Sequence, residues 1–258
     1  MNEVNKTLYI PLYGKAYVSR KGIILDDKSA QRIWAEANFK LKGKSASKGL
    51  AYYMGMRARV FDDWVRGKIA ENPDAVVLHI GAGLDGRVER VGCEALWYDI
   101  DFPDVISERK KHFAEGGKYL MLGSDVREGG WLKKVSGECA IVIMEGVSMY
   151  LTPDELENLL RSIFVRFDEV YLLMDCYTVF AAKMSKIKNP INDVGVTQVY
   201  GIDDPASLEK AGLIYVGERD MTPEHLINEL SGVEKFIFKK LYGGKASKKL
   251  YRLYEYKK

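Results

Sequence analysis

The chain has 258 residues, which is enough for one large α/β domain or two small ones around a sizeable buried core. Its formal net charge of +3 is close to neutral, so charge alone indicates neither a nucleic-acid partner nor an anionic membrane. The three cysteines lie far apart with no C-x-x-C pair, which argues against a disulfide framework or a bound metal. There is no signal-peptide profile and no run near the roughly 18 apolar residues of a membrane span, so we expect a cytoplasmic protein with no membrane partner.

The order of predicted elements indicates an α/β protein. Residues 1–75 are mostly helical in pattern and are predicted to form a cap packed on a sheet. From residue 76 to 258, strands alternate with helices, the pattern of a doubly wound, mostly parallel sheet. We expect strands over 75–80, 94–101, 118–125, 139–145, 169–177 and 211–219, a last edge strand over 248–258, helices over 104–115 and 151–164, and a lid-like insertion near 180–200.

A cation lies in the middle of an apolar helix face. In "KGLAYYMGMRARVFDDWVRGKI", spacing at ~100° per residue puts Arg57 among the apolar residues, whereas Arg59 falls on the polar side with Asp63. A guanidinium buried without a partner costs several kcal/mol, so an anion must meet Arg57. That anion is either a carboxylate of the protein or part of a ligand.

A glycine-rich turn follows the first strand. In "VVLHIGAGLDGRVERV", Gly81, Gly83 and Gly86 have the G-x-G-x-x-G spacing by which a backbone turn approaches a dinucleotide. This spacing keeps a nicotinamide-dependent oxidoreductase open as an alternative. On its own it is a weak signal.

Acidic residues follow the next three strands. Parallel sheets bind ligands outside the carboxyl ends of their strands, where Asp101 is placed to accept ribose hydroxyls and Asp125 to contact an adenine edge. Glu145 would then lie at the centre of the crevice, where it suits an ammonium group and repels a pyrophosphate. A cation, a glycine turn and several carboxylates match S-adenosylmethionine better than a dinucleotide.

Several stretches, in order along most of the chain, resemble one known family: "TLYIPLYGKA", "RARVFDD", "IGAGLDGR", "WYDIDFPDVISERKK", "MEGVSMYLTPDE" and "GIDDPASLEKAG". They are similar to the tetracenomycin-type polyketide O-methyltransferases of the leucine carboxyl methyltransferase superfamily. The resemblance implies a class I methyltransferase fold, a Rossmann-like seven-stranded sheet, with S-adenosylmethionine as cofactor. It also implies the cofactor-binding residues: Arg57 for the methionyl carboxylate, Gly81, Ala82 and Gly83 in the turn, Asp101 at the ribose, Asp125 and Val126 at the adenine, and Glu145 after the fourth strand.

The sequence departs from this family at three positions. Where relatives usually have Asp-Thr-Arg after the turn, this chain has Gly86 between Asp85 and Arg87, so the third glycine is a local substitution and not a dinucleotide fingerprint. His79 replaces an apolar strand residue, and we interpret it as a satisfied core histidine. Lys15 stands where relatives commonly carry arginine, which leaves open how an anionic substrate is held.

The methyl acceptor is predicted from the residues around it. Tyr13, Tyr17, Tyr150 and Tyr177 are the candidate substrate-binding residues, and they suit a flat, apolar small molecule. None of the three histidines is an obvious general base, so no catalytic residue is assigned. A carboxylate needs no base, whereas a hydroxyl does. We therefore expect O-methylation of a small acid and no nucleic-acid partner, with a non-catalytic binding protein as a further alternative and the oligomeric state open.

Overall fold

A seven-stranded sheet organises the molecule. The computed structural model describes residues 7–37, 39–92, 94–185 and 198–258. The strand order is β3-β2-β1-β4-β5-β7-β6, and β7 runs antiparallel to both of its neighbours while the other pairs are parallel. The strands are β1 (Val76–Ile80), β2 (Trp97–Asp101), β3 (Tyr119–Gly123), β4 (Cys139–Met144), β5 (Glu169–Tyr177), β6 (Ile214–Glu218) and β7 (Tyr251–Lys257). This topology confirms the predicted doubly wound, mostly parallel sheet.

The position of the last strand corrects one prediction. We expected residues 248–258 to form an edge strand, but β7 lies inside the sheet, between β5 and β6, and β6 is the edge. The alternating pattern of this segment favours a half-exposed strand, yet Leu253, Tyr254, Glu255 and Tyr256 are all buried. Glu255 is accommodated because its carboxylate accepts hydrogen bonds from Trp64 (2.9 Å) and Arg219 (2.6 Å).

The helices cover both faces of the sheet. Val76, Leu78 and Ile80 of β1 share one core with α7, whereas Val77 packs on the other face with Phe61 of α4. Helix α7 follows the N-cap residue Thr152, which forms a capping box with Glu155. The helices in chain order are α2 (Tyr9–Arg20), α3 (Lys28–Glu36), α4 (Lys48–Glu71), α5 (Arg87–Val91), α6 (Pro103–Arg109), α7 (Pro153–Arg166), α8 (Val179–Ser185), α9 (Glu224–Ile227), α10 (Gly232–Tyr242) and α11 (Lys245–Lys248).

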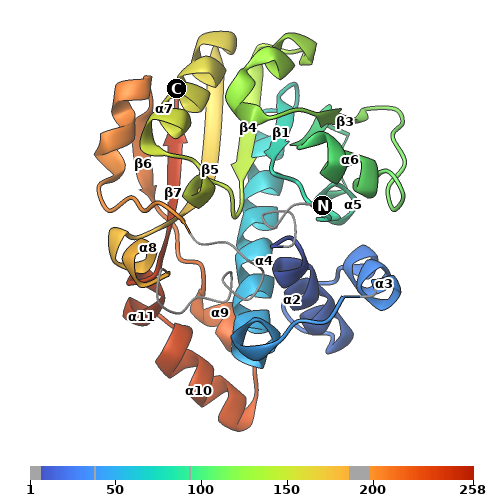
Figure 1. Ribbon diagram of the computed structural model, residues 1–258, viewed down its shortest axis with the longest axis vertical. Coiled ribbons are helices and arrows are strands. Elements are labelled where there is room, and N and C mark those ends of the chain that lie inside the picture. The colour runs from blue at the N-terminus through green and yellow to red at the C-terminus, as the bar shows by residue number, and fades with distance from the viewer. Residues whose placement is uncertain (1–6, 38, 93, 186–197) are drawn as a thin grey trace.

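Helix α4 connects the sheet to the rest of the molecule. It passes behind the strands and continues beyond their carboxyl ends, where it packs against α2 (Figure 1). The same end of the sheet is surrounded by α8, α10 and α11. None of the helices in the described ranges combines the length and the apolar composition that crossing a membrane requires. The division into a cap over 1–75 and a core over 76–258 stays a prediction.

Two predicted segments differ in detail. The helix expected over 104–115 spans Pro103–Arg109, and its last residue, Arg109, is buried and pairs with Asp99. Of the lid-like insertion expected near 180–200, residues 186–197 lie outside the described part of the chain. The part before them is helical, in α8. Short 3-10 helices complete the fold: η1 (Gly43–Ala46), η2 (Val126–Glu128), η3 (Gly130–Lys134), η4 (Ser148–Tyr150) and η6 (Pro205–Ala211).

Candidate functional site

The turn after β1 brings bare backbone to the centre of the sheet edge. Gly81 and Gly83 both have positive φ (69° and 51°), a conformation that glycine adopts without steric cost. A Cβ atom on Gly81 would lie 2.2 Å from Cγ2 of Val147, so only glycine fits there without a shift. The missing side chains therefore leave room for a ligand beside the turn, whose Gly81 and Gly83 N–H groups donate to Ile100 O and to Asp101, each at 2.8 Å.

Asp101 holds this turn in place from the end of β2. Its Oδ2 accepts the Gly83 N–H at 2.8 Å, and its Oδ1 accepts the Phe102 N–H at 2.8 Å. Burial raises the pKa of Asp101, although these two N–H groups oppose the shift. Each carboxylate oxygen keeps further acceptor capacity, which suits a pair of hydroxyl groups.

Asp125 and Val126 follow β3 at the same edge. Asp125 caps η2 by accepting the Arg127 N–H at 3.0 Å, and the Arg127 guanidinium pairs with the same carboxylate. These contacts lower the pKa of Asp125. Half-buried Val126 leaves an apolar surface next to this carboxylate.

Arg57 is clamped between two buried carboxylates. Its Nε donates to Glu145 Oε1 at 3.0 Å and its Nη1 to Asp175 Oδ2 at 2.7 Å. The anion expected from the apolar helix face is therefore supplied by the protein. Asp175 was not predicted, although an aspartate within the apolar strand "EVYLLMDCY" was a usable signal. As predicted, Arg59 lies on the exposed side and pairs with Asp63 (2.8 Å).

Glu145 is shared with a second arginine. Arg87, which is fully buried, forms a short ion pair with Glu145 and a 2.7 Å contact with Asp62. Burial of Glu145 favours the neutral carboxyl, but the charges of Arg87 and Arg57 outweigh it and lower the pKa of Glu145 to about 2. Glu145 is therefore a carboxylate at neutral pH.

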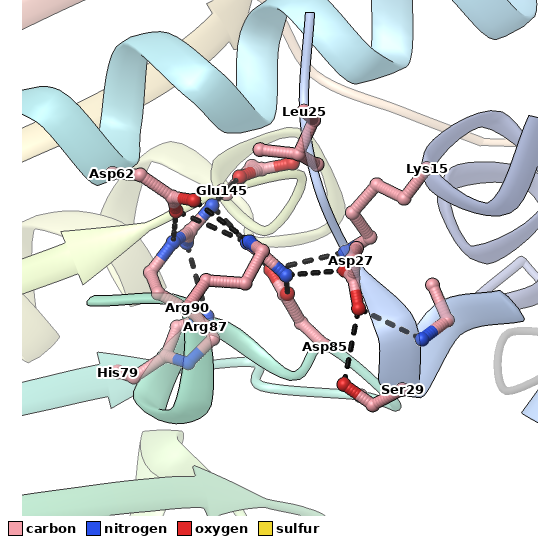
Figure 2. A network of polar contacts seen from close by, with 12 residues as sticks. Lys15, Leu25, Asp27, Ser29, Asp62, His79, Asp85, Arg87, Arg90 and Glu145 are labelled. Atoms are coloured by element: carbon pink, nitrogen blue, oxygen red, sulfur yellow. Dashed lines mark hydrogen bonds and ion pairs between the residues drawn. The ribbon is translucent and has the colours of Figure 1, made fainter. Parts of the chain in front are cut away.

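These groups belong to a larger buried ionic network (Figure 2). Arg90 contacts Asp62 and Asp85, both at 2.7 Å, and pairs with Asp27 before α3. Lys15 of α2 lies 3.0 Å from Asp85. Breaking one member of such a network leaves a buried charge uncompensated, so it fixes the elements it joins. The network ties α2 and α3 to the turn after β1.

His79 is a core residue, as predicted. It is buried, and its Nδ1 lies 2.9 Å from Asp99 Oδ1. Its Nε2 lies 3.3 Å from Arg87 Nη1. Because both ring nitrogens contact protein groups, His79 is poorly placed to take a proton from a substrate.

One cavity of about 830 Å³ lies along the carboxyl ends of the strands. It brings together ten of the predicted site residues: Arg57, Gly81, Ala82, Gly83, Asp101, Asp125, Val126, Glu145, Tyr150 and Tyr177. Tyr13 and Tyr17 do not line it. Their rings pack against one another and against Trp34 and Tyr52, at centroid distances of 5.1–5.9 Å.

The cavity has a second, aromatic half that the sequence analysis largely missed. Tyr53, Tyr177 and Tyr251 line it together with Ser247. The Tyr251 hydroxyl donates to Tyr177 (2.9 Å), and Ser247 donates to Tyr53 (3.2 Å). Tyr53 lies one helical turn before Arg57 on the same face of α4, so the helix spacing was a signal for it. The others come from β5, β7 and α11, which only the fold brings together.

Comparisons with known proteins agree with this arrangement. The sequence profile of the leucine carboxyl methyltransferase family matches residues 12–164. Tetracenomycin polyketide synthesis O-methyltransferase TcmP of Streptomyces glaucescens is 29% identical over 241 residues, covering 91% of this chain and 89% of that protein. The S-adenosyl-L-methionine-dependent methyltransferase dpfgK of Gibberella zeae is 29% identical over 234 residues, covering 79% of this chain and 77% of that protein.

Solved structures share the fold. A protein from Thermobifida fusca YX, assigned as a methyltransferase, superposes with a TM-score of 0.58 at 15% identity, covering 95% of this chain and 94% of its own. Magnesium protoporphyrin IX methyltransferase from Synechocystis PCC 6803, with bound SAH, superposes with a TM-score of 0.51 at 11% identity, covering 90% and 94%. At these identities the similarity shows the fold alone.

Proposed function

Because this chain belongs to the leucine carboxyl methyltransferase family, we propose that its cavity holds S-adenosylmethionine in the polar half and a small methyl acceptor in the aromatic half. The protein is an S-adenosylmethionine-dependent methyltransferase. We propose which residues bind the cofactor, what kind of molecule the acceptor is and which of its atoms receives the methyl group. The observation that carries it is the union of a charged half and a tyrosine-lined half in one cavity.

The polar half fits the cofactor. We assign the ribose hydroxyls to Asp101 and the adenine to Asp125 and Val126, with the turn of Gly81, Ala82 and Gly83 beside them. When bound, the cofactor supplies a methyl group already activated on a sulfonium sulfur. The protein then has to hold an acceptor oxygen close to that methyl group and in line with it.

Arg57 and Glu145 suit the amino acid end of the cofactor. Within the described residues, Nη2 of Arg57 donates no hydrogen bond, and Arg57 lines the cavity, so we assign it to the methionyl carboxylate. Glu145, ionised and beside it, is assigned to the ammonium group. A pyrophosphate would face the negative charge of Glu145, which disfavours the nicotinamide alternative.

The aromatic half favours an acceptor that is already ionised. It presents tyrosines and Ser247, and burial raises the pKa of Tyr53, Tyr150 and Tyr251, so these phenols stay neutral at physiological pH. A neutral tyrosine is a poor general base. We therefore infer O-methylation of the carboxylate of a small aromatic or otherwise apolar acid. A hydroxyl acceptor is the second candidate; the name of the Streptomyces relative, an O-methyltransferase, supports transfer to oxygen and fits both candidates.

Methyl-labelled cofactor and a panel of aromatic acids and phenols test this proposal. We expect label on the acids, released as methanol in mild base because it is held as a carboxyl ester. Base-stable label on phenols alone would overturn the carboxylate while leaving O-transfer intact, and label on nitrogen or carbon would overturn O-transfer itself. Thermal shifts with S-adenosylmethionine, S-adenosylhomocysteine and NAD provide the control, and only the first two should stabilise the protein.

A further inference from the structure

Helix α10 presents an apolar stripe to solvent. Val233 and Phe236 are 72% and 70% exposed, and Ile237 and Leu241 are exposed as well. Their i, i+3, i+4, i+8 spacing places all four on one side of the helix. The helix is anchored by Phe238, which is buried and packs against the rings of Tyr52 and Tyr242. Exposed apolar groups gathered in this way mark an interaction surface.

The stripe continues to the opening of the aromatic half. Leu241 also lines the cavity, as do the exposed residues Met184 of α8 and Leu250 before β7. Cavity-lining side chains that are exposed mark where a cavity meets solvent. We define the mouth face as these three apolar residues, the rest of the stripe, and exposed Phe180, which lies one turn before Met184 on α8: Phe180, Met184, Val233, Phe236, Ile237, Leu241 and Leu250.

Most charges on and around the mouth face are positive; one exception is Asp203, whose Oδ1 accepts the Val179 N–H at 2.9 Å. Lys44 lines the opening, Lys183 is on α8, Lys240 lies within the α10 stripe and Lys249 adjoins Leu250; all four are exposed. None of them forms an ion pair with another residue in the described ranges. The nearby carboxylate of Glu234 is already paired with two other lysines, Lys21 and Lys48, both at 2.9 Å.

We propose that the mouth face docks on an anionic lipid surface, from which an apolar acceptor passes directly into the aromatic half of the cavity. A short helix with exposed Phe, Ile and Leu side chains and flanking lysines is suited to lie in the lipid headgroup region. The lysine stems follow the apolar layer while their ammonium groups reach lipid phosphates. The source of the acceptor rests on the proposed function; the docking itself does not.

A second copy of the chain suits this surface less well. A two-fold contact would place Lys240 and its neighbours opposite the same residues of the other copy, and like charges facing one another are costly. The expectation of no membrane partner rests on the lack of a membrane-spanning run, which docking at a lipid surface does not need, and the near-neutral net charge gives no sign of an anionic membrane. Net charge averages over the whole surface, whereas docking depends on the charge around the apolar residues that make contact.

Flotation with lipid vesicles tests the proposal on the full chain saturated with S-adenosylhomocysteine. We expect at least about tenfold more protein bound to vesicles of phosphatidylcholine with 30% phosphatidylglycerol than to phosphatidylcholine alone, and loss of this difference in high salt. The double variant Phe236→Ser/Ile237→Ser should lose binding to both, and Lys240→Glu/Lys249→Glu should lose the preference for anionic vesicles.

Two matched controls separate this face from the rest of the surface. Val165→Ser on α7, which removes an 81% exposed apolar residue, and Lys133→Glu on η3 should both bind vesicles as the wild type does. Absence of vesicle binding by the wild type, or equal losses in the control variants, would overturn the proposal. The proposal would also be overturned if light scattering showed the wild type to be a dimer and the Phe236→Ser/Ile237→Ser variant to be a monomer. Calorimetric binding of S-adenosylhomocysteine, which these variants should retain, reports on the cofactor site separately.

Discussion

At the scale of the residue, Arg57 is the group on which the polar half depends. Arg57→Ala would leave Asp175 as an uncompensated buried carboxylate and Glu145 with Arg87 as its remaining arginine, so we expect unfolding in urea to require about 3–5 kcal/mol less. S-adenosylhomocysteine binding should weaken by ~2–3 kcal/mol in calorimetry, because a charge-assisted contact is lost. Arg57→Lys keeps the positive charge but loses the planar set of guanidinium N–H donors, so it should fall between the wild type and Arg57→Ala in both measurements.

Arg59→Ala is the matched control for Arg57. It removes a cation two residues away in the same helix, but one that is partly exposed and paired with Asp63 at the surface. The cost should stay below about 1 kcal/mol, with cofactor binding unchanged. Equal losses from the two variants would contradict the assigned helix face and the role given to Arg57.

At the scale of the element, the turn between β1 and α5 is matched to the start of α3. A Cβ atom on Gly86 would lie 2.1 Å from Ser29 Oγ and 3.1 Å from Ser29 Cβ. Because α3 packs against residue 86, there is no room for a side chain there. Gly86→Ala should therefore destabilise the protein by about 1–3 kcal/mol in urea unfolding. Combining it with Ser29→Gly should recover part of that loss, because the clash involves Ser29 alone below 3.4 Å.

Gly67→Ala is the control, because it makes the same glycine-to-alanine change at a position with room for the added Cβ atom. Gly67 lies within α4, and nothing is within 4 Å of the position its Cβ would take. Alanine should stabilise the helix by about 0.5–1 kcal/mol. Two outcomes would refute the close packing of α3 on the turn. One is that Gly86→Ala stabilises the protein as Gly67→Ala does. The other is that the unfolding free energies lost in Gly86→Ala and Ser29→Gly simply add in the double variant.

At the scale of the whole molecule, buried carboxylates tie stability to pH. Arginine partners outweigh burial and lower the pKa of both Asp99 and Glu145 to about 2. A carboxyl whose folded-state pKa lies below its unfolded value stabilises the fold fully above the unfolded pKa, near 4, and loses that contribution as pH falls toward 2. The free energy of unfolding should therefore decrease between about pH 5 and pH 2.

Glu145→Gln removes one titrating carboxyl group from the pH dependence of the unfolding free energy. The slope of unfolding free energy against pH should become shallower by up to about 1.4 kcal/mol per pH unit in that range. Glu128→Gln, at an exposed carboxylate, should leave the slope as in the wild type. A slope unaffected by Glu145→Gln would show that the carboxylate does not bind its arginines more strongly in the folded state.

Much of this molecule follows from local patterns in its sequence. Local patterns predicted the strands of the sheet and the helix over 151–164 that the structure has as α7, because both depend on neighbouring residues. The residues at the strand ends, such as Asp101 and Glu145, were predicted to share one edge, since parallel strands end on the same side. Helix spacing also separated buried Arg57 from exposed Arg59.

The tertiary structure decided which distant groups meet. Arg57 is paired with Glu145 and Asp175, 88 and 118 residues away, and no local pattern specifies such partners. The place of β7 inside the sheet depends on hydrogen bonds to two other strands, and its own alternation predicted an edge. The same reason explains the aromatic half of the cavity: its tyrosines lie on separate elements, and only packing of the whole chain brings their rings together.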